Sequence, residues 1–212
     1  MLAGAEGARL RKGGALAVTA DDLIAFEHEV AEAFKARKIR GPIHLSGGNE
    51  RQLIQIFQGI DRADWIFSNY RSHYHCLLHG VPRDLVMREI LAGRSMTLCF
   101  PEYRFTSSAI VGGTLPIAVG VAAALKRSGS PRKVWVFVGD MAATAGAFHE
   151  ATQYVAGHEL PCRFVIEDNS LSCDTPTAYC WGESLRHPSD IVARYKYGRV
   201  YPHVGVNEWV SF

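Results

Sequence analysis

Acidic and amide side chains follow two apolar runs of the sequence, at the points where these runs end. Gly139 and Asp140 follow the run 134–138, and Asn169 closes a Glu-Asp-Asn segment after the run 162–166. If the runs are neighbouring parallel strands, their ends lie about 5 Å apart, at the edge where open α/β sheets bind ligands. A carboxylate and an amide oxygen suit Mg²⁺. The spacing therefore predicts a candidate magnesium site, although it also fits ordinary turn and cap roles.

The elements around these residues predict how they are positioned. The run Val134–Val138 is continuously apolar, as in a strand buried on both faces, and 142–157 is alanine-rich and helical. With the run 162–166, this pattern indicates a right-handed strand–helix–strand crossover in a parallel sheet. The amino end of the helix after Asp140 would offer free N–H groups to a phosphate, a common partner of Mg²⁺.

Periodicity and boundary residues assign the rest of the chain. Thr19 and Asp22 form a capping-box pattern, and apolar residues at helical spacing continue to about Arg37. We expect a loop at 41–48, a helix at 52–60, a strand at 64–70, a helix between Pro82 and Gly93, and a buried helix at 112–127. The histidine-rich segment 71–80 and the segment 100–108 are predicted to be loops.

Composition limits the class of protein. With 212 residues, 48% of them apolar, the chain can form one domain with a sizeable core. The net charge of +2 without long charge runs predicts neither a nucleic-acid nor a membrane partner. Residues 1–18 lack an apolar signal region and are predicted to be a disordered leader before a single domain at 19–212. Five cysteines without paired metal spacing favour reduced thiols and a cytoplasmic location.

The stretch from Gly139 to Asn169 resembles the thiamine diphosphate motif, which opens with Gly-Asp-Gly and closes with Asn-Asn. Asp140 and Asn169 stand 29 positions apart, within the range of that motif. Over roughly residues 21–178 the chain also resembles the α subunits of 2-oxo acid dehydrogenases of the pyruvate and branched-chain types. That resemblance implies a three-layer α/β/α fold with a mainly parallel sheet. Four ordered blocks carry it: Gly41-Pro-Ile-His44-Leu, Asn69-Tyr70-Arg71-Ser-His73, Ile110-Val111-Gly112 with Pro116, and Leu160-Pro161-Cys162.

The resemblance implies that the chain binds thiamine diphosphate through Mg²⁺. Asp140 and Asn169 would ligate the ion through their side chains, and Leu171 through its backbone carbonyl. Tyr70 and Arg71 would bind the diphosphate, for which a guanidinium group is well shaped.

The same resemblance assigns contacts to the reactive end of the cofactor. His44 and His73 would lie near the thiazolium carbon and the substrate carboxylate, as catalytic residues. The other implied cofactor-binding positions are Ile110, Val111, Gly139, Met141 and Ala142.

Three features depart from the family pattern. Met141 replaces the third glycine of the motif, where a side chain would crowd the approach of the backbone to the diphosphate. Asp168 replaces the first asparagine of the closing pair and adds a negative charge. The chain ends at Phe212, before the late histidine loop of the family, and no positional argument selects His187 or His203 as a substitute.

The resemblance also implies a partner and a reaction. In this family a separate β-type subunit supplies the glutamate that activates the pyrimidine ring, so the active site would lie at the interface of an α2β2 assembly. The bound cofactor acts as a carbanion-forming ylid and electron sink. The expected reaction decarboxylates a small-molecule 2-oxo acid and transfers the resulting acyl or aldehyde unit.

Alternative interpretations remain open from the sequence. The chain could be the amino-terminal half of a split transketolase acting on a ketose, because His149-Glu150-Ala151 and the segment 167–172 resemble that enzyme as well. It could also be a non-catalytic scaffold subunit. Within the segment 71–80, three histidines and a cysteine could instead bind zinc, and these are His73, His75, Cys76 and His79.

Overall fold

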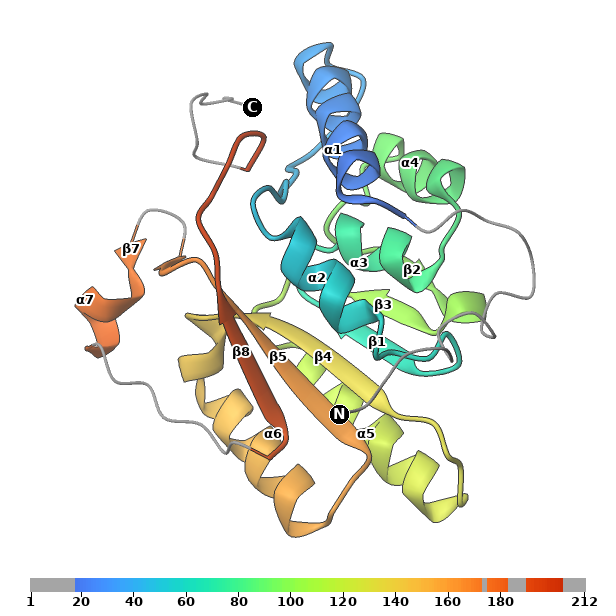
Figure 1. Ribbon diagram of the computed structural model, residues 1–212, viewed down its shortest axis with the longest axis vertical. Coiled ribbons are helices and arrows are strands. Elements are labelled where there is room, and N and C mark those ends of the chain that lie inside the picture. The colour runs from blue at the N-terminus through green and yellow to red at the C-terminus, as the bar shows by residue number, and fades with distance from the viewer. Residues whose placement is uncertain (1–17, 173–174, 183–189, 204–212) are drawn as a thin grey trace, which may run out of the picture.

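The computed structural model describes residues 18–172, 175–182 and 190–203, which contain a six-stranded sheet with helices on both faces (Figure 1). The strand order is β2-β3-β1-β4-β5-β8. Only β2 is antiparallel to its neighbour β3, and the other neighbouring strands are parallel. The predicted mainly parallel sheet is therefore confirmed. The strands are β1 (Trp65–Ser68), β2 (Cys99–Phe100), β3 (Phe105–Ser107), β4 (Val134–Gly139), β5 (Cys162–Asp168) and β8 (Val192–Lys196).

Helices from the two halves of the chain cover opposite faces of this sheet (Figure 1). One face carries α1 (Ala20–Lys35), α2 (Glu50–Phe57), α3 (His73–His79) and α4 (Arg83–Leu91). The other face carries α5 (Thr114–Arg127) and α6 (Gly146–Gly157). This arrangement is the three-layer α/β/α fold that the resemblance implied. The short elements are η1 (Pro101–Tyr103), η2 (Ala142–Thr144), β6 (Leu171–Ser172), β7 (Thr175–Pro176) and α7 (Thr177–Trp181).

Two apolar cores lie on the two faces of the sheet, because successive side chains of a strand point to opposite faces. In β4, Phe137 packs into the core beneath α1 to α4, whereas Val136 and Val138 pack against α5 and α6. In β5, Val165 and Ile166 divide in the same way. The continuous apolar runs in the sequence are explained by this burial on both sides.

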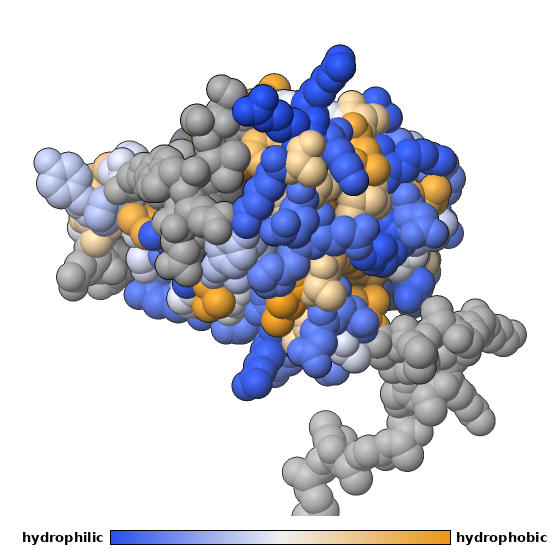
Figure 2. Space-filling view, turned by 90° about the horizontal axis from the view of Figure 1, so that it is seen from above, coloured by the Kyte–Doolittle hydropathy of each residue, from blue (hydrophilic) through white to orange (hydrophobic). Residues whose placement is uncertain are grey.

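Helix α1 begins at the predicted capping box. The Thr19 N–H donates to Asp22 Oδ2 over 2.8 Å, and the Asp22 N–H donates to Thr19 Oγ1 over 3.1 Å. Leu23, Phe26 and Val30 are fully buried on the inner side of the helix. The end of the molecule seen in Figure 2 is mainly hydrophilic among its coloured residues, as expected for outward-facing polar side chains.

Three expectations about local structure were wrong. The segment 71–80 contains helix α3 rather than a loop, and the segment 100–108 contains the last residue of β2, η1 and the whole of β3. Helix α3 forms because nearly all its side chains are buried, and β3 forms because it pairs with β1. Helix α5 is not buried all round, since Ile117 on its outer side is 55% exposed.

The predicted leader lies outside the described residues apart from Val18. No helix in the part of the chain that the structure describes is long and apolar enough to cross a bilayer.

Candidate functional site

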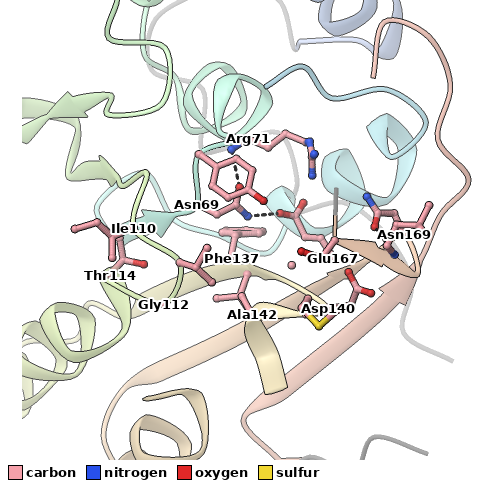
Figure 3. A pocket seen from close by; sticks show the side chains of 17 residues that line it. Asn69, Arg71, Ile110, Gly112, Thr114, Phe137, Asp140, Ala142, Glu167 and Asn169 are labelled. Carbon is pink, nitrogen blue, oxygen red and sulfur yellow. Dashed lines mark hydrogen bonds between the residues drawn. The ribbon is translucent and has the colours of Figure 1, made fainter. Parts of the chain in front are cut away.

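The ends of β4 and β5 form one wall of an open pocket (Figure 3). The two strands pair in parallel, with Gly139 opposite Glu167, so the prediction that they are neighbours is confirmed. Asp140 follows β4 and Asn169 follows β5, and both line the pocket. The pocket is open to solvent, and its volume is about 730 Å³ when that open space is included. The structure thus brings the two candidate metal ligands to one cavity.

Asp140 is a buried carboxylate at the end of β4, only 3% exposed. The Thr177 hydroxyl at the start of α7 donates a hydrogen bond to Asp140 Oδ2. Burial raises the pKa of Asp140, and the charge of Asp168 raises it further, while the Thr177 hydrogen bond lowers it. A buried acid of this kind gains from a cation in the pocket, because a cation restores the stabilisation that water would give to its charge.

The loop that follows β5 holds Asn169 in a defined orientation. Asn169 Oδ1 accepts the Leu171 N–H over 3.0 Å, and between them Ser170 has a left-handed backbone with φ of 63°. Leu171 lines the same pocket as Asn169. Two oxygen donors of different type, a side-chain amide and a backbone carbonyl, therefore come from one short turn.

A basic side chain lies on the opposite wall of the pocket, after β1 (Figure 3). Asn69 Oδ1 accepts the Arg71 N–H over 2.7 Å, and Arg71 Nε donates to the Leu45 carbonyl over 3.2 Å. The first contact holds the Arg71 backbone and the second directs its guanidinium, which can pair with phosphate oxygens. Tyr70 lines the pocket beside it.

The predicted contacts in the loop before α5 also line this cavity. Ile110 and Val111 are 73% and 61% exposed, although both are apolar. Gly112 in the same loop has φ of 73°, a conformation that glycine adopts without strain. The open side of the pocket therefore carries exposed apolar side chains.

Met141 lines the pocket with Ala142, and the backbone conformation of Met141 is one that any residue can adopt. Its φ of −68° and ψ of −37° are ordinary helical values, so glycine is not required for conformation. The Met141 sulfur lies 3.2 Å from Trp181 Nε1. The side chain that departs from the motif thus packs against α7, and its crowding of the diphosphate stays a prediction.

The two candidate catalytic histidines do not line the pocket. His73 is fully buried, with Nδ1 2.9 Å from Glu27 Oε1 and Nε2 2.9 Å from Ser95 Oγ. Both ring nitrogens of His73 therefore have buried partners, and its contact with the substrate stays a prediction. His44 packs against Tyr70 with ring centroids 4.4 Å apart, and burial lowers its pKa to about 4, helped by the charges of Arg71 and His73.

A family model described as "Dehydrogenase E1 component" matches residues 19–184. The chain belongs to this family. It is 31% identical over 165 residues to the α subunit of acetoin:2,6-dichlorophenolindophenol oxidoreductase from Bacillus subtilis, covering 73% of this chain and 49% of that protein. It is also similar to mitochondrial pyruvate dehydrogenase E1 component α subunits. Identity is 28% over 183 residues in Chaetomium thermophilum (82% of this chain, 42% of that protein) and 29% over 194 residues in the human somatic form (85% and 46%). The chain thus spans less than half the length of these relatives.

The buried Glu167 of β5 lines the pocket and was missed as a site residue. Its Oε1 accepts from Tyr195 OH over 2.7 Å and lies 3.1 Å from His75 Nε2, while Oε2 accepts from Asn69 Nδ2 over 3.2 Å. Burial favours a raised pKa of Glu167, but His75 and Tyr195 outweigh it, and the pKa is lowered. The sequence signal that could have identified Glu167 is a charged residue at the end of a mainly apolar run.

The zinc interpretation of the segment 71–80 is not supported in this E1-family chain. Helix α3 directs His73 towards Glu27 and His75 towards Glu167, so the two rings do not share a ligand. Among the described residues, no group of three or more histidine, cysteine, aspartate or glutamate side chains is arranged to hold a metal.

The segment after β8 brings two aromatic residues to Asn169. Tyr197 OH and His203 Nε2 each lie 3.4 Å from Asn169 Nδ2, and His203 is 2% exposed. The segment passes so close to the 41–48 loop that a Cβ at Gly47 would lie 2.1 Å from the Val200 carbonyl oxygen. The structure thus gives the positional argument for His203 that the sequence lacked. His187 lies outside the described residues.

Proposed function

We propose that this chain is the α-type subunit of a thiamine diphosphate- and Mg²⁺-dependent enzyme that decarboxylates a 2-oxo acid and transfers the acyl or aldehyde unit. One observation carries the proposal: in a chain of the E1 family, a single pocket is lined by the acid after β4, the amide after β5 and a phosphate-matching arginine. The printed names of its relatives, E1 component and acetoin oxidoreductase α subunits, support the reaction class.

The residues present fit the implied groups. Asp140, Asn169 and the Leu171 carbonyl form a hard, all-oxygen donor set, which Mg²⁺ prefers. Arg71 and Tyr70 on the facing wall would hold the diphosphate. When bound, thiamine diphosphate supplies the electron sink that cleavage next to a carbonyl needs.

The remaining residues of the pocket would orient these groups and limit the access of water. Ile110 and Val111 would contact the cofactor on the open side of the pocket, with Gly139, Met141 and Ala142 along the β4 end. We retain His44 as a candidate for substrate contact. For His73 we propose a positioning role instead, because both ring nitrogens already bond to buried side chains.

We further propose a β-type partner subunit in an α2β2 assembly. The exposed apolar side chains of Ile110 and Val111 beside the pocket support a protein surface that covers them. Both carboxylate oxygens of Glu167 are already hydrogen-bonded, so the pyrimidine-activating glutamate is assigned to the partner. A cytoplasmic location stays a prediction from the free thiols of Cys76, Cys99, Cys162 and Cys180, and several relatives are mitochondrial by name.

The test begins with the complex of the full chain and the partner that co-purifies with it. Calorimetric titration with Mg²⁺ and thiamine diphosphate should show binding, which Asp140→Ala weakens by at least about tenfold. Glu150→Ala, on the exposed side of α6, serves as the matched control. Absence of binding by the complex, or an Asp140→Ala complex that binds like the unmodified one, would support a scaffold subunit instead.

The loaded complex is then screened with 2-oxo acids and ketoses. Release of carbon dioxide from a 2-oxo acid is the expected result. Ketol transfer between sugars, without release of carbon dioxide, would replace this proposal with the split transketolase.

A further inference from the structure

The departure at Asp168 is matched by a partner on the neighbouring strand. Asp168 ends β5 and is 1% exposed, and it does not line the pocket. Arg194 of β8 reaches its Oδ2 with Nη2 at 2.5 Å and Nε at 3.0 Å. The charge that the sequence adds beside the site is therefore neutralised within the fold by an arginine 26 positions away.

The second oxygen of the same carboxylate shapes the loop that carries the candidate metal ligands. Asp168 Oδ1 accepts the Ser170 N–H over 2.8 Å and the Ser170 hydroxyl over 3.4 Å. Ser170 is left-handed, which costs free energy for a residue with a Cβ. The next turn repeats the pattern, with Asn169 Oδ1 accepting the Leu171 N–H. Two successive side-chain turns therefore set the direction of Asn169 and of the Leu171 backbone.

The two oxygens of Asp168 thus have separate partners. Oδ2 pairs with Arg194, and Oδ1 holds the Ser170 turn. Without Arg194, the buried carboxylate would lose its only ion-pair partner among the described residues. Such an unpaired carboxylate would rotate towards another positive or donor group. That rotation would release the Ser170 turn and, with it, the two donors that line the pocket.

We propose that Asp168 and Arg194 are a positioning pair that holds the 169–171 loop in the geometry required for Mg²⁺ and thiamine diphosphate. The proposal rests on the proposed function for its ligand. The loop geometry itself can be measured without the ligand. An asparagine at position 168 could keep the turn to Ser170 through its amide oxygen, so the arginine is required only when the residue is acidic.

The experiment compares four forms of the full chain in its native complex: unmodified, Arg194→Met, Asp168→Asn, and the double variant. Amide hydrogen exchange of Ser170 and Leu171, without cofactor, should be at least about tenfold faster in Arg194→Met and near normal in the double variant. Lys196→Met, which removes a positive charge from the same strand, is the control and should leave exchange unchanged.

The second measurement is the affinity for thiamine diphosphate with Mg²⁺. Arg194→Met should weaken binding about tenfold or more, and the double variant should recover it. If Arg194→Met cannot be obtained in folded form, recovery of folding and binding in the double variant supports the pair.

Three results would overturn the pairing: normal exchange in Arg194→Met, equal affinity of Arg194→Met and the unmodified complex, or a double variant as impaired as Arg194→Met. If the unmodified complex binds no cofactor, the proposed function fails, and the exchange data still decide whether the pair holds the loop.

Discussion

Two buried histidine–glutamate contacts, built on the same helix, differ in what surrounds them. His73 and His75 of α3 each bridge one buried glutamate and one buried serine. His73 joins Glu27 to Ser95, beneath α1. His75 joins Glu167 to Ser68, at the wall of the pocket. Residues i and i+2 of a helix point about 200° apart around its axis, so the two rings face opposite directions.

The two glutamates respond differently to burial. Burial raises the pKa of Glu27, and the contacts with His73 and the Ser46 N–H offset it only in part. Glu167 has additional donors, Tyr195 OH and the side-chain amides of Asn49 and Asn69, and its pKa is lowered. The histidine lowers the pKa of the glutamate in both pairs, so the further donors around Glu167 account for the difference. The comparison suggests that the Glu27 pair stabilises the fold and the Glu167 pair shapes the site.

The largest expected effect is that of Glu27→Ala. This change leaves His73 and the Ser46 N–H without their partner in the core, and removal of one member of a buried pair costs about 3–5 kcal/mol. Denaturant unfolding of the full chain should show this loss. Glu32→Ala, at the exposed end of the same helix, should change the free energy of unfolding by less than about 1 kcal/mol. A loss below about 1 kcal/mol for Glu27→Ala would contradict a stabilising role.

Tyr195→Phe is expected to have the next largest effect, on the other pair. It removes the 2.7 Å hydrogen bond to Glu167 Oε1 but keeps the ring, and a bond to a charged group contributes about 1.5–3 kcal/mol. We expect a loss near 1.5 kcal/mol, because Asn49 and His75 still donate to the same oxygen. Tyr103→Phe is the control, because the Tyr103 hydroxyl has no hydrogen bond to another of the described residues. Equal unfolding free energies for both variants would show that Tyr195 does not hold the carboxylate.

The sequence predicted the parts of this molecule that depend on local patterns. The unit from Val134 to Asp168 was recognised because strands buried on both faces are mainly apolar, and the capping box at Thr19 lies within a single turn. Helix α3 was missed because its polar residues are stabilised by distant partners: Glu27 lies 46 positions from His73, and Glu167 lies 92 positions from His75.

The same difference separates the predicted and the missed parts of the site. Asp140 and Asn169 were predicted because each follows an apolar run. Thr177 and Arg194 were missed, since they reach Asp140 and Asp168 from 37 and 26 positions away and lie in α7 and β8, which are too short to give a periodic signal in the sequence. Contacts of that range are set by the packing of the strands, and only the fold reveals them.

A third prediction separates the two histidines by their effect on ligand binding. His75→Phe keeps the stacking on Phe137, where ring centroids lie 4.3 Å apart, but removes one of the three hydrogen-bond partners of Glu167 Oε1. Affinity for Mg²⁺ with thiamine diphosphate should fall about tenfold, equal to about 1.4 kcal/mol. His73→Phe should lower stability and leave the affinity of the folded complex within about twofold. Titration calorimetry of both variants decides, and a similar loss of affinity in both would remove the distinction between the pairs.

The smallest effect concerns His44, whose pKa is lowered to about 4 by burial and by the charges of Arg71 and His73. Because this folded-state pKa lies below the ordinary value of 6.5, the unfolded chain binds more protons between pH 6.5 and 4. The stability that neutral His44 contributes is therefore complete above pH 6.5 and is lost as the pH falls towards 4. His44→Gln should reduce this loss by about 1 kcal/mol, a value that allows for solvent around a partly exposed ring. Unfolding curves at pH 7 and pH 4.5 measure the difference. In His73→Phe, the His44 titration followed by NMR should move upwards, and an unchanged titration would mean that His73 does not contribute to the lowered pKa of His44.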